Sequence, residues 1–445
     1  MIVSEPSQPA VAKAKQWLWG LLLIAGATSG FALAAGSHFR PKVGYVSDFT
    51  QDWLSAREVI ANRPPYGDLW AMVRQQFHGE PPTDFLQWNA HPPASILLVL
   101  PLGFLRHEIA FFVWNLATFP LFVVAVWIVM AELAPWNWRR GALAALAIGA
   151  VGITCFPLLH QVVMGQFNAL LAFLIAVAWA SDRRGWWLTA GLAVGFAAAI
   201  KLFPAFLFLY LLGTRRWRTV GVAVAVIVAV NAVALGVFGF GAYRTYAFEV
   251  VPAVSAKYAT QWNNLSLQAF WLRLFDPTPE SRIVAVAHLP LLGKLLGALS
   301  RFAVIVLTGL AAWRATSLAA RDRAFALAVT GMILVSPIAW PHYLIMLAVP
   351  IGVLGANLYR SAWRWPLVAC VAVMWLPDTF TSRVAFGPEF VEQMSIQRHS
   401  PLSPVHNLLI VSVLHYAVLG AFLLTLRLPV SSTEGERASK PAENR

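Results

Sequence analysis

The chain has 445 residues, of which 59% are hydrophobic and only 12% are charged, and its mean hydropathy is +0.65. About a quarter of the residues in a water-soluble globular chain are charged. This chain therefore has too little polar surface to coat a compact body in water. The composition excludes a soluble globular fold and predicts an integral membrane protein.

The charge is strongly basic: 33 Lys and Arg against 20 Asp and Glu give a net +13. A basic chain can indicate nucleic-acid binding, but here the positive residues form short clusters between apolar runs, as membrane orientation requires. Nucleic acid is therefore excluded as a partner. Cys155 and Cys370 both lie in apolar runs, so we expect neither a disulfide framework nor a thiolate metal site.

Apolar runs predict the fold, because a helix needs about 20 apolar residues to cross a bilayer. We expect an all-α polytopic membrane protein with about 12 transmembrane helices. The runs lie near 17–36, 109–133, 141–160, 167–180, 186–200, 202–213, 217–240, 290–313, 324–338, 341–357, 364–378 and 404–426. Several are short, which favours broken or tilted helices. The shorter stretch 94–105 predicts a re-entrant or interfacial helix.

The basic clusters predict the orientation. They are Lys13 with Lys15, Arg139-Arg140, Arg183-Arg184, Arg215-Arg216-Arg218, Arg321 with Arg323, and Arg360 with Arg364. All fall on one side if 94–105 does not cross the membrane, and such clusters remain in the cytoplasm. We therefore expect a multi-pass protein of the inner (plasma) membrane with both termini cytoplasmic. Phe31–Ala35 also resembles a signal-peptidase site, but its apolar run is long enough to span, which favours an uncleaved anchor.

We expect one integral-membrane domain over 1–430 and a polar, disordered cytoplasmic tail over 431–445. Three long polar segments, 37–93, 241–289 and 379–403, then face outward and carry most of the acidic residues. The chemistry is therefore predicted on the outer, extracytoplasmic face.

The first outer segment contains a candidate base. Asp48 and Asp52 recur at helical spacing beside Phe49 and Trp53, which predicts an amphipathic helix lying along the membrane surface. A carboxylate half sunk beside aromatic rings has a raised proton affinity and can act as a general base. The alternative is that Asp48 only caps the helix and Asp52 faces water, and the residue pattern leaves both interpretations open.

Polar residues at outer helix ends are further candidates. Gln166 and Asn168 lie in a tight turn, where their amides can bind sugar hydroxyls or simply satisfy the ends of two helices. Lys201 lies between two short spans. An ionisable residue at membrane depth is a functional candidate, here for an anionic lipid phosphate, and the alternative is a lysine that reaches the interface.

Two later segments offer donors for a sugar or a phosphate. Asn264 and Arg273 follow Trp262 in the second outer segment, although an ordinary polar loop has the same appearance. His342 follows Pro341 at a proline break between two spans and can donate to a phosphate leaving group, or be structural. The ten histidines show no metal-binding spacing, so we expect no metal site.

Six segments together, in this order, resemble the polyprenol-phosphate-mannose-dependent glycosyltransferases of family 87, in the membrane-embedded GT-C class. They are Ser47-Asp48-Phe49 with Arg57 and Arg63-Pro64-Pro65-Tyr66; His91-Pro92-Pro93; Gly165-Gln166-Phe167-Asn168; Ile200-Lys201-Leu202-Phe203-Pro204; Asn264-Leu265-Ser266; and Ser336-Pro337 with Trp340 and His342. The chain departs from the family pattern at His91, where an aromatic residue is frequent, and at Pro341-His342-Tyr343, which replaces a frequent histidine pair.

The resemblance implies that a hexose, mannose above all, moves from a polyprenyl-phosphate-sugar donor to a glycolipid or glycan acceptor, with inversion and without a cofactor. It implies Asp48 as the base, with Asp52 as the spare carboxylate. Lys201, His342 and Arg273 are expected to stabilise the charge on the lipid phosphate. Gln166, Asn168, Asn264 and His91 are expected to bind substrate, and membrane lipids surround the protein.

Two other classes of protein are also compatible with the sequence. A secondary transporter or lipid-sugar flippase would also have about 12 spans, but such proteins usually show internal repeats and place ionisable residues near the bilayer midplane. The second alternative is a membrane scaffold without catalysis. The polar candidates of this chain lie at outer helix ends instead, which favours the transferase.

Overall fold

The computed structural model describes residues 47–80, 87–133, 154–376 and 401–429. Within them the regular elements are helices, and the sole strand-like feature is an isolated bridge between Ile283 and Leu402. The expected first span at 17–36, most of the one at 141–160, most of the outer segment 379–403 and the tail 431–445 lie outside the described residues.

The helices follow the predicted apolar runs closely. They are α2 (Asp48–Ile60), α3 (Leu69–Phe77), α4 (Pro93–Val99), η2 (Leu100–Phe104), α5 (His107–Leu133), α7 (Phe156–Met164), α8 (Asn168–Arg183), α9 (Trp187–Ile200), η3 (Phe203–Phe206), α10 (Leu207–Gly213), α11 (Trp217–Thr245), η4 (Tyr246–Val250), α12 (Val251–Lys257), α13 (Leu267–Phe275), η5 (Pro279–Ser281), α14 (Pro290–Trp313), α15 (Leu318–Val335), η6 (Pro341–Leu347), α16 (Ala348–Leu358), α17 (Arg364–Trp375), α20 (Pro404–His406), η7 (Asn407–Val411) and α21 (Val413–Leu426).

The all-helical, membrane-spanning class is confirmed. Among the described residues, four helical stretches are long and apolar enough to cross a membrane: His107–Leu133, Trp217–Lys257, Pro290–Trp313 and Pro341–Leu358. The number is six if each of two bent pairs, α7 with α8 and the helices over Pro404–Leu426, counts as one span. The remaining apolar helices have 10–17 residues, so length and composition alone support fewer crossings than the predicted 12.

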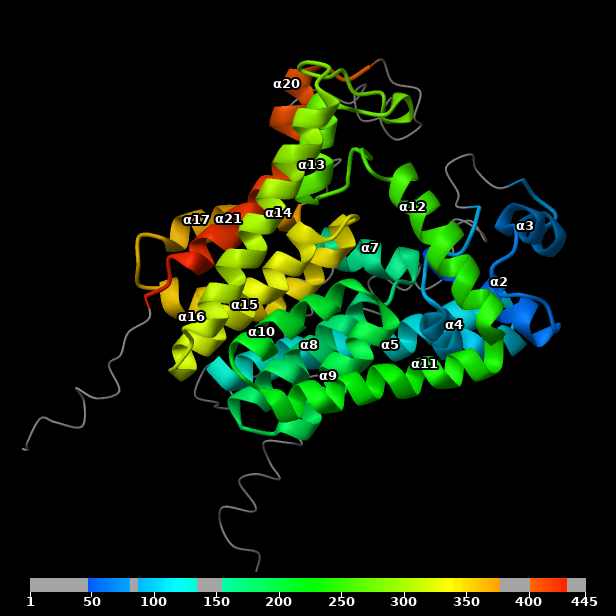
Figure 1. The fold of residues 1–445 in the computed structure, drawn as a ribbon, viewed down its shortest axis with the longest axis horizontal. Coiled ribbons are helices and arrows are strands. Elements are labelled where there is room, and N and C mark those ends of the chain that lie inside the picture. The colour runs from blue at the N-terminus through cyan, green and yellow to red at the C-terminus, as the bar shows by residue number, and fades with distance from the viewer. Residues whose placement is uncertain (1–46, 81–86, 134–153, 377–400, 430–445) are drawn as a thin grey trace, which may run out of the picture.

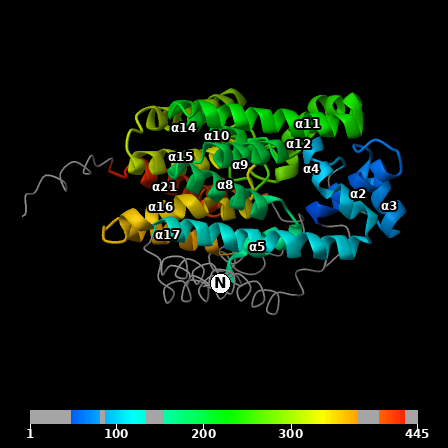
Figure 2. The same cartoon turned by 90° about the horizontal axis from the view of Figure 1, so that it is seen from below.

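The helices stack in layers. Figure 2 shows α11 and α14 along one face, α5 and α17 along the opposite face, and α8, α9 and α15 between them. Helix α9 packs on both α8 and α11, α5 packs on α8, and α14 packs on α15. Helices α2, α3 and α4 form a smaller lobe at one edge, beside the bend that leads from α11 into α12 (Figure 1).

Helix α2 is present as predicted, but its surroundings differ from the expectation. Every side chain from Phe49 to Ala56 is buried, whereas Arg57 is exposed. An amphipathic helix on a membrane surface would leave one face in water. The first two turns of α2 are instead packed on all sides by protein, because aromatic side chains of α5 and the 87–95 segment close around them.

One end of the bundle is held by ion pairs. Arg183, at the end of α8, pairs with Glu132 of α5 at 3.3 Å and with Asp322 of α15, while Arg184 also pairs with Glu132. Arg216 pairs with Asp182 at 2.8 Å. We call these residues the arginine end. Since α8 has 16 residues, its other end lies about 24 Å away at 1.5 Å per residue.

The shared pairing of Arg183 gives a stability prediction. Arg183→Ala leaves two largely buried carboxylates without their common cation, so we expect a loss of about 3 kcal/mol in unfolding free energy. Arg184→Ala is the matched control: this side chain is 49% exposed, and such pairs contribute little. Thermal unfolding in detergent is the measurement, and equal effects of the two substitutions would contradict the assignment.

Candidate functional site

A cavity of about 650 Å³ lies at the end of α8 opposite the arginine end. Five of the residues that the sequence predicts as site residues line it: Asp48, His91, Gln166, Lys201 and His342. They come from five separate segments of the chain, the start of α2, the segment before α4, the turn between α7 and α8, the break after α9, and η6. The fold therefore brings together side chains that are up to 294 residues apart in sequence (342 − 48).

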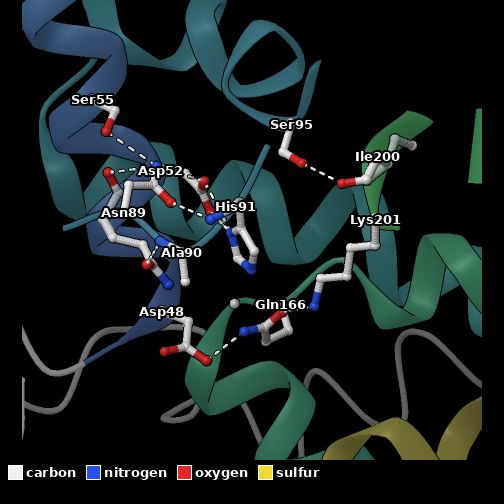
Figure 3. A network of polar contacts seen from close by, with 12 residues as sticks. Asp48, Asp52, Ser55, Asn89, Ala90, His91, Ser95, Gln166, Ile200 and Lys201 are labelled. Carbon is white, nitrogen blue, oxygen red and sulfur yellow. Dashed lines mark hydrogen bonds and ion pairs between the residues drawn. The ribbon is translucent and has the colours of Figure 1, made fainter. Parts of the chain in front are cut away.

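The amide of Gln166 joins the two charged groups of the cavity (Figure 3). Its nitrogen donates to the carboxylate of Asp48, and its oxygen accepts from the ammonium of Lys201 at 2.6 Å. Lys201 is 5% exposed and also lies 4.8 Å from the ring centroid of Tyr343. A lysine reaching for the membrane interface would be exposed, so that alternative is wrong. Asp48 is the first residue of α2 and the N-cap is Ser47, so Asp48 is not the cap.

Gly165 makes the turn that carries Gln166. It ends α7 with φ +61°, a conformation that side chains disfavour. An added Cβ would lie 2.7 Å from Cβ of Phe49 and 2.9 Å from the ring of Phe111. The indole of Trp114 donates to the Gly165 carbonyl at 2.8 Å. The chain bends by 120° between α7 and α8, which places Gln166 at the cavity.

Two histidines lie together on another wall of the cavity. Helix α7 packs on η6, and the rings of His160 and His342 meet edge to face with 5.0 Å between centroids. His342 is 3% exposed. Among the described residues, neither ring nitrogen of His342 and not Nδ1 of His160 has a hydrogen-bond partner. Buried polar groups normally have partners, so the protein leaves the hydrogen-bonding capacity of these nitrogens unused.

The remaining wall is largely apolar. It includes Leu202, Phe203 and Phe206, which follow Lys201, and Met332 and Val335 at the end of α15. The cavity is therefore amphipathic, with a carboxylate, an ammonium and three imidazoles beside an aliphatic and aromatic surface. This combination suits a ligand with a polar, anionic head and an apolar tail.

Two predicted residues stand directly behind the lining. Asn168 is fully buried and donates to Oε1 of Gln161 at 3.0 Å, while its oxygen lies 3.5 Å from Nζ of Lys201. Asp52 is 1% exposed and pairs with Nδ1 of His91 at 2.8 Å. It therefore does not face water, and the interpretation of Asp52 as a solvated residue is wrong. Asn168 therefore supports Lys201, and Asp52 supports His91, both of which line the cavity.

Asn264 and Arg273 are not among the residues that line the cavity. Asn264 donates to the carbonyls of Tyr258 and Pro337, both at 3.0 Å. Arg273 is fully buried and donates to the carbonyls of Gln261 at 3.1 Å and Asn264 at 2.7 Å. Burial lowers the pKa of the Arg273 guanidinium to about 10, while Tyr416 opposes that shift. Asn264 thus connects the second outer segment to Pro337, while Arg273 stabilises that segment internally and donates to Oδ1 of Asn407 in η7 at 3.3 Å.

A comparison of the sequence with protein-family models identifies the family of the chain. The model of glycosyltransferase family 87 matches residues 89–337, over half of the chain. The chain belongs to glycosyltransferase family 87. The protein is therefore a membrane glycosyltransferase, and the transporter alternative is not favoured.

Relatives with assigned activities agree with the family. The chain is 28% identical over 309 residues, 66% of this chain and 69% of the relative, to a protein of Mycolicibacterium smegmatis named polyprenol-phosphate-mannose-dependent alpha-(1-2)-phosphatidylinositol pentamannoside mannosyltransferase. A Mycobacterium tuberculosis protein of the same name is 30% identical over 66% of each chain. A second Mycolicibacterium smegmatis protein, a phosphatidylinositol mannoside mannosyltransferase with the same donor in its name, is 26% identical over 81% of this chain and 80% of its own length. No solved structure matches the chain.

Sequence reasoning did not predict His160 or Tyr343 as lining residues of this glycosyltransferase. His160 lies on α7, five residues before Gly165, in an apolar run that gives no sign of a site. The one sequence feature that could have indicated His160 is that a histidine in an apolar run needs a hydrogen-bond partner when it is buried. Within the described residues, no group of three or more His, Cys, Asp or Glu side chains can hold a metal ion.

Gly165 gives a prediction with a matched control. Gly165→Ala combines a left-handed backbone with a clash against rigid neighbours, so we expect at least about 2 kcal/mol of destabilisation and loss of transfer. Gly185 also has a positive φ, +75°, but nothing lies within 4 Å of an added Cβ. Gly185→Ala is expected to cost only about 1 kcal/mol and to retain activity. Thermal unfolding and initial rates measure both, and retained activity in Gly165→Ala would contradict the role of this turn.

Proposed function

We propose that this enzyme transfers mannose from polyprenyl-phosphate-mannose to a glycolipid acceptor of the phosphatidylinositol mannoside class. The reaction inverts the anomeric carbon, requires no metal or other cofactor, and takes place at the outer face of the plasma membrane. The relatives carry this donor and this class of acceptor in their names. The observation that carries the proposal is the bridged pair of Asp48 and Lys201, which lines the same amphipathic cavity as His342.

The acceptor half of the reaction belongs to Asp48. A hydroxyl attacks the anomeric carbon, the new C–O bond forms, and the proton of that hydroxyl passes to the carboxylate of Asp48. The donation from Gln166 holds this carboxylate in one orientation. Asp48 is only partly buried, unlike Asp52. A hydroxyl can therefore reach Asp48 directly.

The cationic side of the cavity acts on the sugar donor and its leaving phosphate. As the bond from the anomeric carbon to the phosphate oxygen breaks, the sugar gains oxocarbenium character and the phosphate gains negative charge. Lys201 supplies a fixed ammonium, and His342 and His160 supply hydrogen-bonding nitrogens that the protein leaves unused. Preorganised donors of this kind lower the barrier when they point at the developing charge. The apolar wall beside Lys201 accepts the start of the polyprenyl chain.

The orientation follows from the two ends of the bundle. The arginine end carries the clusters that the positive-inside pattern keeps in the cytoplasm, and α8 separates it from the cavity. This supports an extracytoplasmic active site in a single GT-C-like domain over 1–430, with about 12 crossings, several of them short, and both termini cytoplasmic.

Asp48→Asn tests the base. The amide cannot take up the proton of the acceptor, so we expect transfer from polyprenyl-phosphate-mannose to fall about 10³-fold. Glu58→Gln is the control on the same helix, because Glu58 pairs with Arg63 outside the cavity. Assays run with a chelator test metal independence at the same time. Full activity in Asp48→Asn would exclude this residue as the base.

Lys201→Met tests the cationic side. It preserves much of the side-chain length and removes the charge, so we expect kcat to fall about 10²-fold. Lys257→Met is the control, since Lys257 is exposed at the end of α12 and does not line the cavity. Single-turnover rates at saturating donor give the measurement. An effect confined to the acceptor KM would contradict a role at the leaving phosphate.

A further inference from the structure

Asp52 and His91 form a buried pair at the edge of the cavity. Nδ1 of His91 lies 2.8 Å from one oxygen of Asp52 and 3.0 Å from the other. The ring of His91 also packs edge to face against Phe167, with 5.1 Å between centroids. Two oxygen contacts and one ring contact therefore fix both the position and the plane of this imidazole.

The backbone around His91 is held as firmly as the ring. Nδ2 of Asn89 contacts Oδ1 of Asp52 and the hydroxyl of Ser55, both at 3.1 Å. The hydroxyl of Tyr66 donates to the carbonyl of His91 at 2.7 Å. Burial, with smaller contributions from Tyr246, Asp52 and Tyr243, raises the pKa of the Tyr66 phenol, which keeps this donor protonated.

The pairing determines which nitrogen of His91 carries hydrogen. A carboxylate only accepts, so Nδ1 facing Asp52 is the N–H, and in the neutral ring Nε2 carries a lone pair. Figure 3 shows His91 between Asp52 and the row formed by Asp48, Gln166 and Lys201, with its second nitrogen directed toward that row. His91 lines the cavity, whereas Asp52 does not. The pair thus presents a hydrogen-bond acceptor to a ligand.

Asp48 and Asp52 are four residues apart on α2, so they lie on one face of the helix, about 6 Å apart. The carboxylate of Asp48 lines the cavity itself. The carboxylate of Asp52 instead contacts the imidazole of His91, which lines the cavity. Asp48 and His91 therefore present two acceptors to the same cavity, enough for two hydroxyls of a single sugar ring. Resting on the proposed function, we infer that Nε2 of His91 binds a second hydroxyl of the acceptor sugar, beside the hydroxyl that Asp48 deprotonates, and that Asp52 is the positioning residue that sets the tautomer of His91.

Deoxygenated acceptors test the contact directly. The assay uses octyl α-mannoside and its 3-deoxy, 4-deoxy and 6-deoxy analogues with polyprenyl-phosphate-mannose as donor. We expect one analogue to show an acceptor KM about tenfold above that of the parent, the loss of one hydrogen bond. With His91→Phe we expect the KM for octyl α-mannoside itself to be about tenfold higher than with the wild type. The deoxy analogue that is weakened in the wild type should then show no additional increase in KM. An unchanged acceptor KM in His91→Phe, or the same penalty as in the wild type, would overturn the inference.

Asp52→Asn tests the positioning role with an isosteric change. Because Asn89 donates to Oδ1, the new amide keeps its oxygen there and places its NH₂ at the position of Oδ2, 2.8 Å from Nδ1. Nε2 then becomes a donor rather than an acceptor. We expect the acceptor KM to rise about tenfold while the donor KM is unchanged, although the packing is preserved.

The double variant separates this mechanism from a structural effect. If Asp52 acts through His91, Asp52→Asn with His91→Phe has the acceptor KM of His91→Phe alone. Additive increases, or an Asp52→Asn enzyme with the wild-type acceptor KM, would overturn the inference. The double variant also leaves no buried carboxylate without its partner, so the deoxygenated acceptors are tested on it if His91→Phe alone unfolds, and thermal unfolding checks each protein.

Failure of the proposed function has a different signature. If the wild-type enzyme transfers mannose neither to these acceptors nor to a phosphatidylinositol mannoside, the proposed function fails and the inference fails with it. If the wild type transfers mannose and Asp48→Asn abolishes transfer, but no analogue is coupled to His91, only the inference fails.

Discussion

One glutamine amide holds a carboxylate and an ammonium at the edge of a largely apolar protein. Charges removed from water are costly unless each is matched by hydrogen bonds or an opposite charge, and the side chain of Gln166 satisfies both at once. The amide also keeps Asp48 and Lys201 apart, so that neither neutralises the other by direct contact. The site therefore depends on where Gln166 lies, and that is decided by the left-handed turn at Gly165 and the 120° bend that follows it.

The charged and polar side chains at the two ends of the bundle differ in how they are paired. At the arginine end, Glu132, Asp182 and Asp322 each pair with an arginine, so the end is a structural clamp. At the cavity, hydrogen-bonding capacity is left unused, above all on His342. Helices α8, α9 and α15 each run from the clamp to the cavity, so the clamped end fixes the positions of Asn168, Lys201 and Ser336 at the other. The ion pairs therefore stabilise these helices at the end opposite the cavity.

Hydropathy predicted most of the helices, because a long apolar run has few other stable forms in a membrane. The run at 290–313 coincides with α14, and five predicted site residues do meet in one cavity. The differences between the predicted residues and the residues that line the cavity have a common cause. Arg273 and Asn264 looked like ligand donors because local sequence does not reveal that backbone carbonyls are their partners. His160 was missed because its role depends on a tertiary contact with His342 across 182 residues (342 − 160).

The burial of α2 matters most among these differences. Aromatic and polar residues alternating at helical spacing fit a membrane surface as well as a protein interior, so the sequence could not decide between them. On a surface, Asp52 would be hydrated, and an imidazole bound to it would gain little fixed direction. In the structure Asp52 is 1% exposed and its partners are Asn89 and His91. Exclusion of water strengthens those contacts, so the same packing that hides the second carboxylate of α2 gives it control over the orientation of His91.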